Sequence, residues 1–413
     1  PAAFDRLKSA LAAGGPAAAI EKLLAELRQA GDYNALFYAL LMKKRVELGV
    51  SPFPTGPSAD LPPHTHEAYE QAIREAGRRV GNLYLSRGDL PKAWAFFRLI
   101  GEPEPVREAL AKLEPGPDTD VYPLIEIAWQ NGVLPEKGFD LVLDRHGVCS
   151  AITMVGSSDL NPNPKLRDYC VGRLVRALHA QLSERVQGDL EARGWPVPPD
   201  ATLTDIVQGY PQLYADDAYH IDTSHLSSVA QMSLYLPAGP ENEMARELCE
   251  YGRRLAPGLK GGGDAPFDET FDDYLAFLNV VAGKDTPGPA GIPPDPLRGA
   301  GEGPRGAGSQ VDAGLERFRA KAAREAAEGA TYAAQVYVNL LVRIGRERQA
   351  LEAARAFLLN EDERNLICPG VAELARRLGD YAALADVARS RSDAVQFLAG
   401  LIAGSGLVAP VKG

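Results

Sequence analysis

The stretch from Gly81 to Phe96 reads GNLYLSRGDLPKAWAF and decides the expected fold class. Helix-forming residues run up to Gly88, and glycine readily takes the left-handed conformation that closes a helix. After Gly88-Asp89 a second helix begins with small and aromatic residues, Ala93 and Trp94 among them. Small residues at this position let two paired helices approach closely. The stretch therefore predicts a helical hairpin with its aromatic residues packed between the helices.

The same turn recurs along the chain, at Gly31-Asp32, at Gly345 and at Gly379-Asp380. The last two glycines, Gly345 and Gly379, are 34 residues apart. This pattern resembles the helical hairpin of tetratricopeptide repeats, whose period has that length. The resemblance covers roughly a third of the chain and implies a repeat or α-solenoid architecture. It speaks to architecture, because such hairpins occur in scaffolds and enzymes alike.

Most of the remaining sequence also predicts helix. Apolar residues recur at spacings of three and four in Ala17 to Leu40, Tyr69 to Leu85 and Ala333 to Leu358, the period of an amphipathic helix. Extended structure is expected only in Val148 to Val155 and around Tyr210 to Ile221. The expected fold class is mainly α, with hairpin repeats and Pro/Gly-rich loops.

Composition and charge exclude several classes of protein. The 413 residues are 45% hydrophobic and 24% charged, as in an ordinary globular protein. A net charge of -11 argues against a nucleic-acid partner, which calls for a basic face. No apolar run is long enough to span a bilayer, so no membrane partner is expected either.

The cysteines and the start of the chain favour a cytoplasmic protein. Cys149, Cys170, Cys249 and Cys368 are far apart and form no CxxC pair, which argues against a zinc knuckle or a dense disulfide framework. The first residues lack the basic start and apolar core of a signal peptide. The chain begins at Pro1 rather than Met, which is consistent with an upstream segment that was removed or left out.

One abrupt change of composition suggests a domain boundary. Residues 283–312 are rich in Gly and Pro and contain few large apolar residues, as expected of a linker or exposed loop. They separate a predicted helical domain, 1–282, from a C-terminal block of hairpins, 313–404. Residues 405–413 resemble a frayed tail.

Two histidine clusters carry the strongest chemical signal. They are His64-Thr-His66 and His220-Ile-Asp222-Thr-Ser-His225. Imidazole is a common ligand of transition metals, and a carboxylate can complete such a site or orient a histidine ligand. The sequence therefore predicts His64, His66, His220, Asp222 and His225 as ligands of one divalent transition metal. Zn or Fe is expected first, with Cu, Ni or Mn as further possibilities.

A simpler interpretation of both clusters is helix capping. Thr65 suits the N-cap of a helix from Glu67 to Leu85. Asp222, or a neighbouring hydroxyl residue, suits the N-cap of a helix from His225 to about Leu236. The positive end of a helix also disfavours a cation beside His66.

Other residues are candidates for catalysis and substrate binding. His146 and Tyr219 could transfer protons, and Glu70 could act as a base or further ligand. Arg145 could bind a substrate carboxylate or phosphate. The competing interpretation of this region is a turn at Gly147.

Two further motifs indicate ordinary loops and helix starts. The run Gly261-Gly-Gly263 lacks the phosphate-loop pattern. The acidic run from Asp268 to Tyr274 could meet a cation, although such residues are more typical of the first turn of a helix. Serine-hydrolase, zinc-protease, dinucleotide and kinase motifs are missing.

These observations favour a metal-dependent enzyme, most simply a hydrolase that activates a metal-bound water. Its substrate would be a small molecule or a peptide. One alternative is a non-catalytic interaction scaffold that binds a protein partner on its helical repeats. Another is a non-haem iron or copper oxidoreductase.

Overall fold

The computed structural model describes residues 2–53, 61–197, 200–283 and 307–405. Over these ranges the chain forms helices and connecting turns, with no β-strand, which confirms the mainly α prediction. Of the two segments predicted to be extended, Val148 to Val155 is helical, and the one around Tyr210 to Ile221 consists of 3-10 turns followed by a short loop. Val148, Ala151 and Val155 are buried at helical spacing within one helix, and Pro211–Asp217 forms 3-10 turns. Burial of one face at helical spacing thus prevails over the strand preference of β-branched residues.

The first of two compact units is Pro1–Ala151. Gly15 breaks α1, and Gly147 breaks α7, each with a positive φ angle. A short 3-10 turn at Pro63–Thr65 precedes α3, and a π-helical turn at Glu126–Gln130 continues α6. The helices that begin in this unit are α1 (Ala2–Ala30), α2 (Tyr33–Glu47), α3 (His66–Leu85), α4 (Leu90–Ile100), α5 (Glu104–Lys112), α6 (Tyr122–Ile125) and α7 (Pro135–Gly156).

The second unit is Ile152–Gly413. Short turns accompany its helices at Pro211–Asp217, Pro257–Leu259 and Glu363–Asn365. Its helices are α8 (Pro164–Ala192), α9 (Leu203–Gly209), α10 (Thr223–Ser233), α11 (Pro240–Arg254), α12 (Phe271–Ala282), α13 (Ala307–Ala327), α14 (Tyr332–Arg343), α15 (Glu347–Phe357), α16 (Val371–Leu378), α17 (Tyr381–Ser390) and α18 (Ala394–Gly404).

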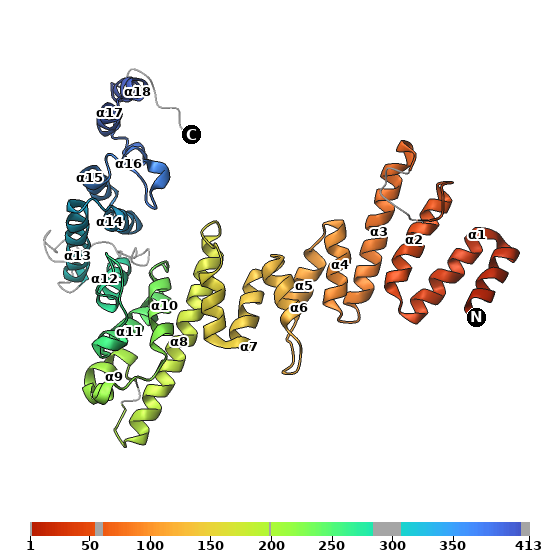
Figure 1. Ribbon diagram of the computed structural model, residues 1–413, viewed down its shortest axis with the longest axis horizontal. Helices are drawn as coiled ribbons and strands as arrows, with labels where there is room; N and C mark the ends of the chain where they lie inside the picture. The colour runs from red at the N-terminus through yellow and green to blue at the C-terminus, as the bar shows by residue number, and fades with distance from the viewer. Residues whose placement is uncertain (1, 54–60, 198–199, 284–306, 406–413) are drawn as a thin grey trace, which may run out of the picture. The chain divides into compact units, whose positions relative to one another are not determined.

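Three of the predicted turns share one geometry. In each, a glycine with φ between 66° and 75° precedes an aspartate. The aspartate carboxylate accepts the backbone N–H three residues further on, at 3.0–3.2 Å, and so caps the following helix. Figure 1 shows two of the resulting hairpins as α3/α4 and α16/α17. The glycine-aspartate pairs are Gly31-Asp32, Gly88-Asp89 and Gly379-Asp380.

The α3/α4 hairpin shows why small residues are needed where paired helices touch. A Cβ atom at Gly81 would lie 2.6 Å from the ring of Phe97. A Cβ at Gly77 would lie equally close to Ile100. The glycines thus let the α4 side chains pack directly against α3, and Phe96 and Phe97 are buried there as predicted.

The predicted boundary at 283–312 falls inside the second unit. Residues 284–306 lie outside the described residues, and α13 begins at Ala307, within the predicted linker. Phe277 and Val280 of α12 share one apolar core with Phe318 of α13 and Leu340 of α14. Helices on both sides of the Gly/Pro-rich stretch therefore belong to one core. The predicted tail, apart from Ser405, also lies outside the described residues.

Within the described part of the chain, none of the helices is both long and apolar enough to span a bilayer.

Candidate functional site

The first histidine cluster lies where a short turn meets α3, in the first unit. His64 is exposed, and the His66 ring forms a hydrogen bond to the Leu61 carbonyl oxygen at 2.8 Å. Thr65 precedes α3 as predicted, but its hydroxyl donates to the Pro62 carbonyl and makes no cap hydrogen bond. Glu70 is exposed on the same helix.

The second cluster lies in the second unit, where its polar groups already have partners. The His220 side chain is buried, with Nδ1 3.0 Å from the Tyr251 hydroxyl and Nε2 3.2 Å from Asp189 Oδ2. In the neutral ring, Nε2 is the donor because a carboxylate only accepts, and Nδ1 then accepts from the Tyr251 hydroxyl. The same hydroxyl accepts the His220 backbone N–H at 2.7 Å. His220 thus pins the loop before α10 onto α8 and α11.

Asp222 is the N-cap of α10, as the capping interpretation predicts. Its Oδ1 accepts the backbone N–H groups of Ser224 at 2.9 Å and His225 at 3.2 Å. The Ser224 hydroxyl, which also donates to it, contributes most to holding the pKa of Asp222 below its ordinary value. His225 is half-buried in the first turn of the helix.

The histidine clusters belong to different compact units. Among the residues that the structure describes, no three His, Cys, Asp or Glu side chains form a group suited to a metal ion. The metal-dependent enzyme and its cofactor therefore stay predictions from the sequence.

The remaining predicted site residues are spread over both units. The Arg145 guanidinium donates to the carbonyl oxygens of Pro115, Gly116 and Pro117, so it holds the loop before α6. His146 packs against the Tyr122 ring, with centroids 5.1 Å apart, and its buried Nε2 has no partner among the described residues. Tyr219, in the second unit, is exposed.

Sequence reasoning missed a groove of about 500 Å³ in the second unit, termed the unit-2 groove below. Helices α7, α8, α10, α12 and α14 contribute to it, together with four loops. Its volume is in the range of ligand-binding clefts. The buried and half-buried apolar side chains that line it are Val155, Leu160, Val171, Met232, Leu234, Phe267, Phe277 and Val336.

Large apolar side chains are also exposed along this groove. Tyr235, Tyr332 and Ile367 line it and are each about half exposed to solvent. Exposed aromatic and aliphatic residues gathered beside a hollow are typical of an interaction site.

The polar lining of the unit-2 groove has unused hydrogen-bonding capacity. Asn161, Gln231 and Asn339 line it, and none of their side-chain amides makes a hydrogen bond within the described ranges. Asn339 differs from the other two in burial: it is half-buried on α14, whereas Asn161 and Gln231 are exposed. A side-chain amide offers both a donor and an acceptor. Such groups can pair with a peptide backbone.

Two arginines also line the groove. Arg167 lies over the Tyr235 ring, 4.4 Å from its centroid, and pairs with Asp168 at 3.1 Å. Arg343 donates to the carbonyl oxygens of Leu234 and Leu236 at the end of α10. Burial, and then the neighbouring Arg167, lower the pKa of Arg343.

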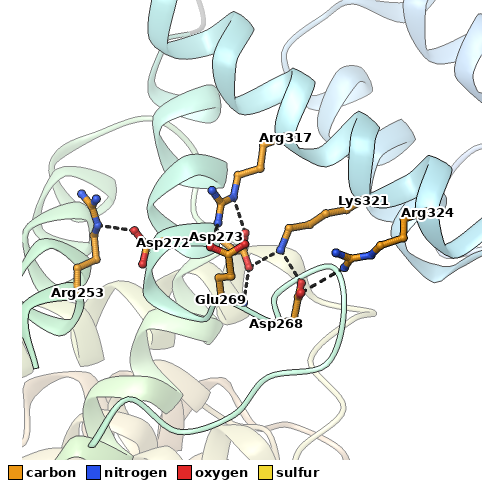
Figure 2. Close-up of polar contacts among 8 residues, drawn as sticks. All are labelled: Arg253, Asp268, Glu269, Asp272, Asp273, Arg317, Lys321 and Arg324. Carbon is orange, nitrogen blue, oxygen red and sulfur yellow. Dashed lines mark hydrogen bonds and ion pairs between the residues drawn. The ribbon is translucent and has the colours of Figure 1, made fainter. Parts of the chain in front are cut away.

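A second polar cluster in the same unit explains the acidic run after Gly263. Asp273 is fully buried, and Figure 2 shows it at the centre of the α12–α13 ion cluster. Its Oδ1 accepts from Arg317 Nε at 2.6 Å, and its Oδ2 accepts from Lys321 Nζ at 2.7 Å. The backbone N–H of Glu269 donates to the same Oδ2 at 2.7 Å. The sequence suggested that this acidic run could meet a cation. In the structure, Arg317 and Lys321 are the cations beside it.

The outer part of the α12–α13 ion cluster is also paired. Lys321 donates to Asp268 Oδ1 at 2.5 Å, and Arg324 donates to Asp268 Oδ2 at 3.2 Å. Arg317 also forms an ion pair with Glu269 at 2.9 Å. Beside the cluster, Arg253 of α11 donates to Asp272 at 2.7 Å.

Comparison with protein-family models, with curated proteins and with solved structures finds no match for this chain. The function of the chain is therefore inferred from the site itself.

Proposed function

We propose that this chain is a non-catalytic interaction scaffold whose unit-2 groove binds a segment of a partner protein. The proposal rests on the half-buried amide of Asn339, which has no hydrogen bond among the described residues and lies beside exposed aromatic residues. An extended peptide presents backbone N–H and C=O groups to such an amide and side chains to apolar pockets.

The hairpin geometry supports a scaffold of tetratricopeptide-like repeats. Gly31, Gly88 and Gly379 each adopt the left-handed conformation ahead of an aspartate cap. Proteins built from stacked helical hairpins commonly bind partners on their extended surfaces. The side chains that line the groove, rather than the repeat architecture, would determine which partner binds.

A peptide-display screen on the full chain tests the proposal. A library of random peptides is selected on the wild-type protein, and the binders are then measured against Tyr332→Ala. We expect an affinity loss of about tenfold or more, because a half-exposed tyrosine at an interface is often an energetic anchor.

The matched control is Tyr38→Ala, which removes a similarly exposed tyrosine from α2 in the first unit. It should leave the affinity unchanged. Thermal melts of both variants establish that folding is retained. Selected peptides that bind wild type and Tyr332→Ala equally well would refute binding in the groove.

A further inference from the structure

We infer that the unit-2 groove selects partner segments that carry a carboxylate side chain beside apolar or aromatic residues. This inference rests on the proposed function and names the chemistry of the bound segment. Its basis is the charge of the groove, which differs in sign from that of the chain.

Among the described residues, the charged side chains that line the groove are cations. They are Arg167 and Arg343, and no described Asp or Glu lines it. The chain as a whole carries 55 acidic and 44 basic residues, for a net charge of -11. A positive hollow on an acidic protein favours anionic segments and disfavours basic ones.

Among the described residues, no carboxylate forms a hydrogen bond with Arg343, although the charge of Asp168 partly offsets the lowering of its pKa. Its guanidinium donates to the Leu234 carbonyl and, at 2.7 Å, to the Leu236 carbonyl. These acceptors are neutral. The group also lies over the Phe277 ring, 5.4 Å from its centroid. A half-buried cation whose hydrogen-bond partners are neutral gains from an anion bound nearby.

Arg167 is placed to contact such an anion directly. Its guanidinium is stacked on the exposed Tyr235 ring. Asp168, which accepts from Arg167 Nε and Nη2, is not part of the groove lining. A planar guanidinium fork matches the geometry of a carboxylate. A bound carboxylate would also reduce the repulsion between Arg167 and Arg343.

The remaining lining determines what accompanies the carboxylate. Phe267, Val336 and the half-exposed Tyr332 provide apolar surface. Asn339 provides a donor and an acceptor for the backbone of the segment. The preferred segment is therefore extended, with an acidic residue next to large apolar ones.

A double-mutant cycle tests this inference on the full-length protein. The probe is a synthetic peptide chosen from the display screen because Tyr332→Ala weakens its binding. In this peptide Asp or Glu is replaced by Asn or Gln, and in the protein Arg167 is replaced by Gln. Fluorescence polarisation then gives the affinity of each combination.

We expect the peptide substitution to weaken binding about tenfold to wild type and less than about twofold to Arg167→Gln. Binding should also weaken as salt is raised. The matched control, Arg176→Gln, alters an arginine of the same helix that pairs with Glu241 outside the groove, and it should keep the wild-type response.

Three results would overturn the inference, and they distinguish its failure from that of the proposed function. Groove-dependent peptides that lack an acidic residue, or independent effects of the two substitutions, would refute acidic selectivity and leave the proposed function standing. A screen without any peptide sensitive to Tyr332→Ala would refute both.

Discussion

The α12–α13 ion cluster and the unit-2 groove lie in the same compact unit but differ in how their polar groups are paired. In the ion cluster, Asp268, Glu269 and Asp273 are matched by Arg317, Lys321 and Arg324. In the described lining of the groove, three amides have no hydrogen bond and the charged residues, Arg167 and Arg343, are cations. Polar groups that satisfy each other hold a fold together, whereas unsatisfied ones in a hollow are available to a ligand.

The largest effect should come from breaking the ion cluster. Lys321→Ala leaves the buried Asp273 with one cation fewer and should lower the free energy of unfolding by about 3–5 kcal/mol. Urea denaturation measures the change. The control is Lys43→Ala, which removes an exposed ion pair with Glu21 and should change stability by less than ~1 kcal/mol. Equal effects of the two variants would contradict the contrast between buried and exposed pairs.

A smaller loss of stability is expected when Asp268 of the ion cluster is protonated. The hydrogen bond from Lys321 is the main cause of a lowered pKa for Asp268, whose ordinary value is 3.8. Its ionised form therefore stabilises the fold above about pH 4, and this contribution is lost as pH falls through the lower folded-state pKa.

Melting temperatures between pH 7 and pH 3 check this prediction. The advantage of the wild type over Asp268→Asn should be full near neutral pH and shrink in the acid range. A constant difference across that range would show that the Asp268 charge contributes nothing to stability.

A substitution in the groove should have the opposite pattern: it should weaken peptide binding and leave the stability of the fold almost unchanged. Asn339→Ala removes an amide without a hydrogen bond among the described residues, so the free energy of unfolding should change by no more than about 0.5 kcal/mol. Affinity for a groove-dependent peptide should fall about fivefold, the value of one hydrogen bond. Asn365→Ala, at an exposed asparagine outside the groove, serves as control. A clearly destabilised Asn339→Ala would mean that this amide has a structural role.

Added metal should have the smallest effect on the stability of the protein. Since the His220 ring already contacts Asp189 and Tyr251, Zn²⁺ or Fe²⁺ should leave the melting temperature of the purified protein almost unchanged. Elemental analysis of the same sample gives the metal content. Stoichiometric metal that disappears in both His64→Ala and His220→Ala would instead support the metal-dependent enzyme.

The local parts of the fold were predictable because their signals are local. A glycine in the left-handed conformation followed by an aspartate cap, as at Gly88-Asp89, involves residues adjacent in sequence. The cap formed by Asp222 follows the same logic. Such short-range patterns locate hairpins and helix starts from the sequence alone.

The sites were not predictable, because their partners are distant in sequence. Asp273 and Lys321 are 48 residues apart, and the acidic run itself gives no hint of the partner helix. Asn339 sits on a helix as an ordinary polar residue until the fold brings Val155 and Phe267 to the same hollow. The histidines drew attention by their rarity, yet the role of His220 depends on Asp189 and Tyr251, each 31 residues away.

The shared core and ion cluster of α12 and α13 bear on how the chain could be divided. Helices α12 and α13 lie before and after residues 284–306 in sequence and contact each other through apolar side chains and ion pairs. A protease that cut the chain between residues 284 and 306 should therefore yield two fragments that stay together. Separately expressed halves should then reassemble on mixing. That property would make the second unit a natural starting point for a split reporter.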